Sequence, residues 1–229
     1  MSDWIWALII GFVLDLLLGD PAWLYHPVCL IGKYIGWMEK KLRRRGGNLR
    51  KSAVFLTAST VLLTVAVVAL ILMLCGLLGR IPLLIAMALL DWMGIAITSM
   101  AKEARGVEKA LGQGVTAGRT QVARIVGRDT QELSEEEIIK ATVETVSENT
   151  TDGVISPLLY AAIGGPILLW GFKAASTLDS MVGYLDEKYR DIGWSSARLD
   201  DVLNYIPARL TALLMVCLLY TSPSPRDRG

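Results

Sequence analysis

The sequence has few cysteines and a single histidine, and neither residue type forms a recognisable framework. Cys29, Cys75 and Cys217 are odd in number and scattered, and none belongs to a Cys-x-x-Cys pair. This pattern argues against a disulfide scaffold and against a zinc site. His26 stands beside Pro27 in a predicted turn. Such a histidine is more often structural than a catalytic base, and both interpretations stay open.

An excess of charge of either sign is also missing. The 229 residues include 23 lysines and arginines and 22 aspartates and glutamates, for a formal net charge of +1. No basic stripe interleaved with aromatic residues occurs, so a nucleic-acid partner is not expected. The pattern GxxxxGK[ST] is absent, and the glycines at 112, 114 and 118 fit neither it nor a dinucleotide fingerprint. Any nucleotide must therefore bind in another way.

Five long stretches are almost without charge. Together they contain only three charged residues, Asp15, Asp91 and Arg209. Such segregation of apolar and charged residues excludes a disordered chain and is typical of a polytopic membrane protein. We predict an all-α membrane helical bundle with amphipathic cytoplasmic helices, forming one domain over residues 1–216. The apolar segments are residues 4–18, 53–78, 81–100, 154–172 and 206–216 and beyond.

The segments at 53–78 and 81–100 are predicted to form a helical hairpin. The first would extend ~39 Å at ~1.5 Å per residue, enough to cross a hydrocarbon core of ~30 Å. The preceding residues 32–52 hold eight basic side chains against one acid, Glu39. By the positive-inside rule this loop lies in the cytoplasm, and residues 101–153 then lie there too.

The fourth apolar segment, residues 154–172, is interrupted by Pro157 and by a Gly-Gly-Pro triplet at 164–166. A full span would place residues 173–205 on the opposite side of the membrane from residues 101–153. A broken or re-entrant segment is tolerated where protein covers it, and it would keep both regions on one side. Both topologies stay open at this point.

The two ends of the chain have unusual features. Residues 4–18 lack a preceding basic region and a cleavage site, so we expect a retained anchor and not a signal peptide. The last apolar segment gives way after Tyr220 to a run rich in serine and proline. A spanning helix is not expected to end in this way. We therefore expect residues 217–229 to be a non-native tail on a truncated chain.

The densest group of candidate metal ligands is Glu144, Glu148, Asn149 and Asp152. A capping-box start at residues 134–137 and apolar periodicity predict a helix that ends near Asn149. Carboxylates at i and i+4 near a helix C-terminus repel each other and oppose the helix dipole, each by ~0.3–1 kcal/mol, and a cation would relieve both. Asn149 and Asp152 add oxygen ligands that suit Mg²⁺. The alternative is a solvated acidic helix end followed by an ordinary turn.

Two arginines upstream are candidates for phosphate binding. Arg124 and Arg128 are spaced i,i+4, and Asp129 stands beside the second. Paired guanidinium groups suit bidentate recognition of phosphate. An ordinary surface salt bridge fits the same spacing equally well.

Further acidic residues are placed where they could serve chemistry. Asp179 begins a second acidic cluster, and Asp200 shares a predicted helix face with Asn204. Asp15 and Asp91 lie within apolar segments, where an acid usually faces a polar cavity because its burial in lipid costs ~2.5–3.5 kcal/mol at mid-helix. Asp91, near the middle of its segment, is the better placed of the two to be functional, and interhelical pairing is the alternative.

Several motifs occur in a fixed order over residues 4–216. They are Asp15-Leu-Leu-Leu-Gly-Asp-Pro21 with His26-Pro27, Val126-Gly-Arg-Asp-Thr130, Glu144-Thr-Val-Ser-Glu-Asn-Thr-Thr-Asp-Gly153, Thr177-Leu-Asp-Ser-Met-Val-Gly-Tyr184 and Gly193-Trp-Ser-Ser-Ala-Arg-Leu-Asp-Asp-Val-Leu-Asn-Tyr-Ile-Pro-Ala-Arg209. Their combination resembles the adenosylcobinamide-phosphate synthase family, integral membrane proteins of cobalamin biosynthesis. The departures are local: the family usually has asparagine at Ser176, and Asn-Glu-Arg-Tyr at residues 186–189.

The resemblance implies an ATP- and Mg²⁺-dependent amide ligation in the cytoplasmic membrane of a bacterium or archaeon. A propionate carboxylate of adenosylcobyric acid would be joined to aminopropanol or its phosphate. That chemistry needs Mg²⁺ and cationic groups for the transferring phosphate, and a base for the amine. We assign the metal to Glu144, Glu148 and Asp152, and substrate and phosphate to Arg124, Arg128, Asp129, Asn149, Arg198, Asn204 and Arg209. Asp179 or Asp200 would bind or deprotonate the amine, and His26 is a further catalytic candidate.

The expected partners are the corrinoid, the amine and the lipid bilayer, and the oligomeric state stays undetermined. One rival hypothesis is a Mg²⁺-dependent intramembrane transferase that acts on a diphosphate substrate. Another is a transporter or scaffold in which Asp15 and Asp91 form an ion path. A transporter of that kind is expected to contain inverted repeats, and no internal repeat stands out in the sequence.

Overall fold

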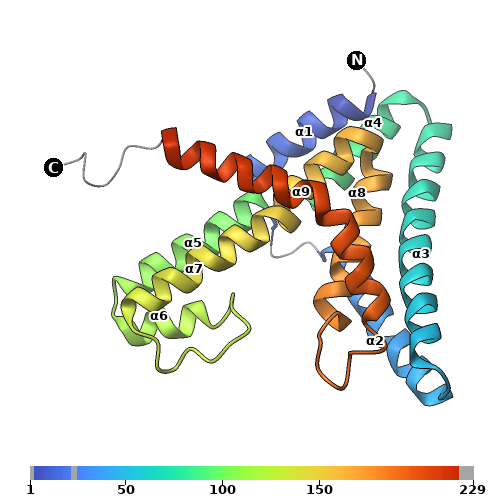
Figure 1. The fold of residues 1–229 in the computed structure, drawn as a ribbon. Helices are drawn as coiled ribbons and strands as arrows, with labels where there is room; N and C mark the ends of the chain where they lie inside the picture. Colours follow the sequence, from blue (N-terminus) through green and yellow to red (C-terminus); the bar gives the residue numbers. More distant parts are fainter. Residues whose placement is uncertain (1–2, 22–24, 222–229) are drawn as a thin grey trace.

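A computed structural model describes residues 3–21 and 25–221 of the chain (Figure 1). Every regular element in those ranges is a helix, which confirms the predicted all-α class. The elements are α1 (Asp3–Leu18), α2 (Pro27–Arg45), α3 (Leu49–Leu77), α4 (Arg80–Gly94), α5 (Ile97–Leu111), α6 (Val115–Val122), α7 (Glu135–Thr150), the π-helix η1 (Thr151–Ile155), α8 (Ser156–Val182) and α9 (Trp194–Thr221).

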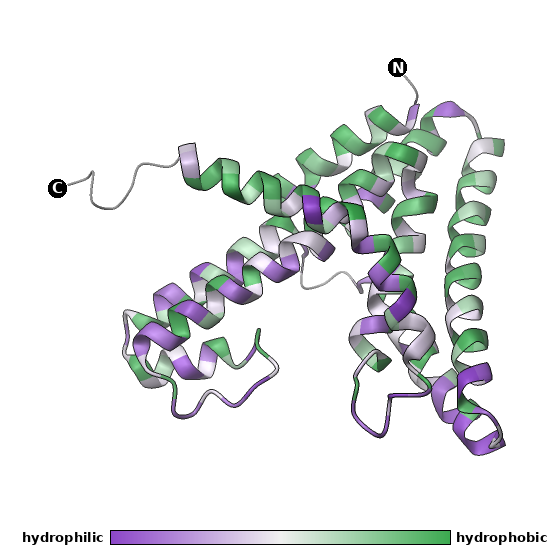
Figure 2. Ribbon diagram, viewed as in Figure 1, coloured by the Kyte–Doolittle hydropathy of each residue, from purple (hydrophilic) through white to green (hydrophobic). Residues whose placement is uncertain are grey.

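Four helical segments are long and apolar enough to cross a membrane, namely Leu49–Leu77, Arg80–Leu111, Glu135–Val182 and Trp194–Thr221. In Figure 2 the hydrophobic colour covers α1, α3, α4 and α8, whereas polar residues gather in α5–α7 and at the turn between α2 and α3. Along α3 large apolar side chains point outward, such as Leu62 with 67% of its surface exposed. These faces suit lipid, and the chain is a membrane helical bundle.

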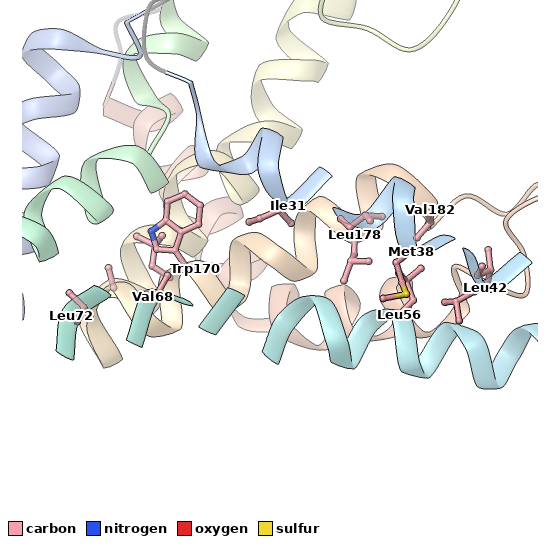
Figure 3. Packing of buried hydrophobic residues seen from close by; sticks show 13 residues of the cluster. Ile31, Met38, Leu42, Leu56, Val68, Leu72, Trp170, Leu178 and Val182 are labelled. Carbon is pink, nitrogen blue, oxygen red and sulfur yellow. The ribbon is translucent and has the colours of Figure 1, made fainter. Parts of the chain in front are cut away.

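The core of the bundle lies between α2, α3 and α8 (Figure 3). Ile31 and Met38 of α2, Leu56 of α3, and Trp170 and Leu178 of α8 are all buried there. Because lipid is as apolar as these side chains, close packing holds the helices together here more than escape from water does. This packing fixes α8 against the two helices that carry the basic turn.

The polar helices α5, α6 and α7 form an arm with its own small core of Val107, Val122, Ile138 and Ala141. The predicted capping box at the start of α7 is confirmed, since the Glu137 backbone N–H donates to Ser134 Oγ at 3.3 Å and Ser134 N–H donates to the Glu137 carboxylate at 2.7 Å. The arm is therefore a packed unit, joined to the bundle through α5 and α7.

α7 ends at Thr150, close to the predicted position, but the turn expected after it is not observed. The backbone stays helical through η1, with Thr151 at φ −62° and ψ −56°, and it runs directly into α8. The backbone carbonyl groups that follow Glu144 and Glu148 therefore accept hydrogen bonds from the continuing helix. The helix dipole thus gives no reason to expect a cation at this point. A π-helical turn of this kind often marks a functional site, because its extra residue redirects the side chains around it.

The apolar segment at 81–100 was predicted as one helix, and it is broken instead. α4 ends at Gly94, and α5 begins at Ile97 after Ala96 at φ −134°. The break is stabilised from outside, because the Asp15 carboxylate of α1 accepts the N–H groups of Ile97 and Thr98 at 3.1 and 3.2 Å. Asp15 thus caps a helix of another segment, a contact that local periodicity does not contain.

Helix α8 reverses direction at Gly164 and Gly165, where Gly165 adopts φ 63° and ψ −159°. In a straight helix Asp152 and Ser176 would stand ~36 Å apart at ~1.5 Å per residue. Instead Ser176 Oγ donates to the Asp152 carboxylate at 3.3 Å. The segment is therefore a helical hairpin broken at Gly164 and Gly165, the form that a re-entrant segment would have.

The reversal returns the chain to the side of the basic turn between α2 and α3. In the loop after α8, the Lys188 carbonyl accepts a hydrogen bond from Arg43, and Asp191 pairs with Arg50 at 3.2 Å. At the opposite end of the bundle Asp3 pairs with Arg80 at 2.7 Å. Residues 173–205 and the α5–α7 arm can therefore serve one site from the same side.

Gly165 offers a test of the reversal. Its φ and ψ lie in a region that is essentially restricted to glycine, so Gly165→Ala is expected to lower the free energy of unfolding by ~1–3 kcal/mol. The measurement is the midpoint of an SDS titration in mixed micelles, followed by circular dichroism. Gly36→Ala in α2 is the control, since nothing lies within 4 Å of its added methyl group and alanine favours the helix. Equal midpoints for the two variants would contradict a strained reversal at Gly165.

The helix that contains the last apolar segment begins well before residue 206 and continues beyond residue 216. It forms α9 from Trp194 to Thr221, with Pro207 inside the helix. The residues from 217 to 221 continue that helix, and the rest of the segment expected to be non-native, residues 222–229, lies outside the described residues.

Candidate functional site

Polar residues of η1 and α9 meet beside the point where α9 crosses the junction of α7 and α8 (Figure 1). Asn204 is the connecting residue. Its Nδ2 donates to Asp152 Oδ1 and to Asp200 Oδ2, both at 2.9 Å. Its Oδ1 accepts the hydroxyl of Ser156 at 2.8 Å. The amide thus holds two carboxylates from different elements in one place.

Three further groups complete this acidic side of the site. Ser176 holds the second oxygen of Asp152 at 3.3 Å, and the Tyr160 hydroxyl donates to the Leu203 carbonyl at 2.9 Å. Asp179 lies within electrostatic range of Asp152 and Asp200. Three carboxylates therefore converge, although like charges repel strongly where water is scarce.

One oxygen of this group is left without a partner. Asp200 Oδ1 is buried and accepts no hydrogen bond from the described residues. An unsatisfied buried carboxylate oxygen costs free energy, so its retention calls for a functional reason. A cation or a donor group of a ligand would satisfy it.

The side-chain amine of Lys173 lies beside Asp152. Lys173 Nζ lies 3.5 Å from the backbone carbonyl of Asp152, and no carboxylate of the described residues comes within 4.0 Å of it. The lysine is the first charged residue after the apolar part of α8. Its amine therefore forms no ion pair with a carboxylate of the described residues.

His26 and Asp20 border Lys173 from the connection between α1 and α2. Burial lowers the pKa of His26, and Lys173 lowers it further, whereas Asp20 and a hydrogen bond to the Met93 carbonyl oppose the shift. His26 Nδ1 accepts the Val28 N–H at 3.2 Å and caps α2. The predicted structural role of His26 is therefore observed, and its neutral ring also adjoins the site.

The predicted metal ligands are not assembled in one place. Glu144 is exposed and pairs with Arg128 at 3.3 Å and Lys140 at 3.9 Å, whereas Asp152 is held by Asn204 on α9. Glu148 is exposed on α7. Within residues 3–21 and 25–221, no group of three histidine, cysteine, aspartate or glutamate side chains has a metal-binding arrangement. The Mg²⁺ assignment stays a prediction.

The predicted phosphate ligands lie on the arm. Arg124 is 3.9 Å from Glu103, and Arg128 pairs with Glu144, so both make the surface ion pairs that were the alternative. Asp129 accepts the Gln131 N–H at 3.0 Å in a turn. Asn149 is exposed beside a cavity of about 170 Å³ between α5 and α7. Their roles with phosphate stay predictions.

Two arginines of α9 point to its exposed side. Arg198 is 3.6 Å from Asp201, and the Arg209 guanidinium stacks 3.5 Å above the ring of Tyr205. Asn204, in contrast, is brought to the centre of the site together with Asp152 and Asp200. Of the predicted residues, the structure therefore unites Asp152, Asp179, Asp200 and Asn204 and places His26 beside Lys173.

The two acids within the apolar segments have different surroundings. Asp15 is fully buried and fixed to the start of α5 by its two hydrogen bonds. Asp91 is fully buried opposite Gly11, and both its oxygens lack a partner among the described residues. The interhelical pairing considered for Asp91 is therefore not observed.

Sequence reasoning missed Lys173, Ser156 and Ser176 as members of the site. The signal for Lys173 was its position directly after residues 154–172, a charge placed where an apolar helix continues. Ser156 and Ser176 gave no such signal, since a lone serine in an apolar helix is common. Their role depends on the reversal of α8, which brings them to Asp152 and Asn204.

Comparisons with known proteins agree with the resemblance seen in the motifs. The family model described as CobD/Cbib protein matches residues 8–228. The cobalamin biosynthesis protein CobD of Pelobacter propionicus is 50% identical over 92% of this chain and 65% of its own length. Those of Listeria monocytogenes and Geobacter metallireducens are each 48% identical, over 90% and 89% of the chain and 66% and 64% of their own lengths. The chain thus spans slightly less than two thirds of these relatives, and no solved structure matches it. It belongs to the CobD/Cbib family.

Proposed function

We propose that this chain takes part in forming adenosylcobinamide phosphate, by ATP-dependent amide ligation of adenosylcobyric acid with aminopropanol or its phosphate. The observation that carries the proposal is the convergence of Asp152, Asp200 and Lys173 in a membrane protein of this family, with one Asp200 oxygen left without a partner. A site that joins a carboxylate to an amine needs one positive and one negative region, and this site has both.

The positive region and the negative region would act on different groups during the reaction. The corrinoid carboxylate takes a phosphoryl group from ATP, which leaves ADP and an acyl phosphate. The neutral amine then attacks the acyl carbon, phosphate leaves with the electron pair of the broken C–O bond, and the amine's proton passes to a carboxylate. Lys173 would hold the oxygens of the carboxylate and acyl phosphate, and Asp200 or Asp179 would bind the amine and accept the proton.

Magnesium would enter with the nucleotide. Mg²⁺ in such sites takes one or two carboxylates together with substrate phosphates, and it neutralises the phosphate charge. The donors fit this requirement, because Asp200 Oδ1 is free to bind and Asp152 lies beside it. Asp152 is the one member of the predicted set Glu144, Glu148 and Asp152 that lies at this point.

We place the site toward the cytoplasmic side of a cytoplasmic membrane. The basic turn at residues 43–50 contacts the loop at residues 183–193 next to α8 and α9, and basic loops face the cytoplasm. ATP is available on that side. The reversal of α8 supports this placement, since it keeps the arm and the acidic cluster on one side of the bundle.

The test uses the absorbance of the corrinoid. Detergent-purified protein is incubated with adenosylcobyric acid, ATP, Mg²⁺ and aminopropanol phosphate, and the products are separated by chromatography and weighed by mass spectrometry. We expect corrinoid to migrate with the protein, ADP release that depends on the corrinoid, and a corrinoid mass increased by the amine less one water. Corrinoid that stays among the small molecules, or ADP release without corrinoid, would overturn the proposal.

A further inference from the structure

Helix α2 has two faces of opposite character. One face packs into the bundle through Ile31, Ile35, Met38 and Leu42. The other carries an exposed group that we call the α2 basic face. It consists of Trp37, Lys40, Lys41, Arg44 and Arg45, which line a shallow hollow of about 420 Å³.

The cations of the α2 basic face have no acidic partner. Within the part of the chain that the structure describes, no carboxylate lies within 4.0 Å of any of them, although Arg43 pairs with Glu39 at 2.7 Å in the same helix. Like charges at i and i+4 oppose helix formation. The helix C-terminus favours cations in its last turn, but this does not account for Lys40 and Lys41 gathering beside a tryptophan.

The α2 basic face lies next to the start of a candidate membrane span. Two glycines and Asn48 separate Arg45 from α3, which is one of the candidate spans. Trp37 is 54% exposed, and Lys41 Nζ stands 4.6 Å above its ring. Tryptophan flanked by lysine and arginine at the end of a span is the usual composition of the headgroup region.

We propose that the α2 basic face binds the phosphate groups of anionic phospholipids in the leaflet that adjoins the turn between α2 and α3. The positive charge of this face and the exposed tryptophan near a candidate span favour this partner. Four unpaired cations suit phosphodiesters, and the exposed indole suits the boundary between headgroups and acyl chains. A nucleic acid would need a broader basic surface, whereas the whole chain has a net charge of only +1.

The test compares lipid retention between two matched pairs of substitutions. Protein reconstituted in nanodiscs of equal phosphatidylcholine and phosphatidylglycerol is extracted gently, and native mass spectrometry counts each lipid bound. Wild type is expected to retain phosphatidylglycerol several-fold over phosphatidylcholine. Lys41→Gln with Arg45→Gln removes an i,i+4 pair from the α2 basic face, and Arg105→Gln with Lys109→Gln removes an exposed i,i+4 pair from α5. The preference is expected to fall toward equality in the first variant and to persist in the second.

Added salt and free phosphate are two further conditions that test whether retention of the lipid is electrostatic. Raising the ionic strength from about 0.1 M to about 1 M shortens the Debye length from ~10 Å to ~3 Å, so retention of phosphatidylglycerol is expected to fall in wild type. Equal losses in both double variants would overturn the proposal, as would complete displacement of the lipid by inorganic phosphate. If the first variant does not elute as a single peak, Lys40→Gln with Arg44→Gln repeats the test on the same face.

Discussion

Replacing Asp200 with asparagine is expected to lower kcat for amide formation by about 10²–10⁴-fold, the range typical of losing a general base. The Asp200 Oδ1 atom is buried and accepts no hydrogen bond from the described part of the chain, and Oδ2 accepts the Asn204 amide. Asparagine keeps the size and the acceptor for Asn204, but it cannot take a proton from the amine. The measurement is the rate of corrinoid amide formation at saturating ATP and amine.

The stability of Asp200→Asn separates a functional role from a structural one. If Asp200 served mainly to stabilise the fold, its replacement would lower the SDS concentration at the midpoint of unfolding. Here we expect the SDS midpoint to stay the same or rise, because the substitution removes a carboxylate that three neighbouring acids repel. Asp201→Asn is the matched control for losing a neighbouring negative charge, since Asp201 is exposed and pairs with Arg198 at 3.6 Å, and its turnover should stay within about twofold of wild type. A fully active Asp200→Asn would refute the assignment.

Replacing Lys173 with methionine is expected to weaken binding of adenosylcobyric acid about ten- to a hundredfold. A hydrogen bond to a charged group contributes ~1.5–3 kcal/mol, and Lys173 Nζ lies 3.5 Å from the Asp152 carbonyl at the edge of the acidic cluster. Methionine retains the length and apolar stem of the side chain, so packing in α8 is preserved. The measurement is the Kd of the corrinoid, from its absorbance change on titration with protein.

A second corrinoid shows whether the loss belongs to the carboxylate. A corrinoid whose propionate is already an amide should bind wild type and Lys173→Met equally, since it lacks the charge that Lys173 would hold. Lys109→Met, on the exposed side of α5, is the control for removing one positive charge. Equal affinity of Lys173→Met and wild type for the free acid would rule out this role, and weaker binding of both corrinoids would point to damage of the pocket.

Some features of this protein follow from local sequence. Residues 53–78 are apolar without interruption and form most of α3, and the turn before Arg80 returns the chain as predicted. The capping box of Ser134 and Glu137 forms because its partners are three residues apart. These interactions are short in sequence, so periodicity and composition are enough to predict them.

The positions of the functional groups required the tertiary structure. Composition and motif order predicted a helical membrane bundle of this family, with Asp152, Asp200 and Asn204 as candidates. Only the packed helices decided that Asp152 pairs with Asn204, a partner 52 residues later, and that Lys173 lies beside the Asp152 carbonyl. The physical reason is the reversal at Gly164 and Gly165 together with the π-turn of η1, which set side-chain directions that helical periodicity alone would place elsewhere.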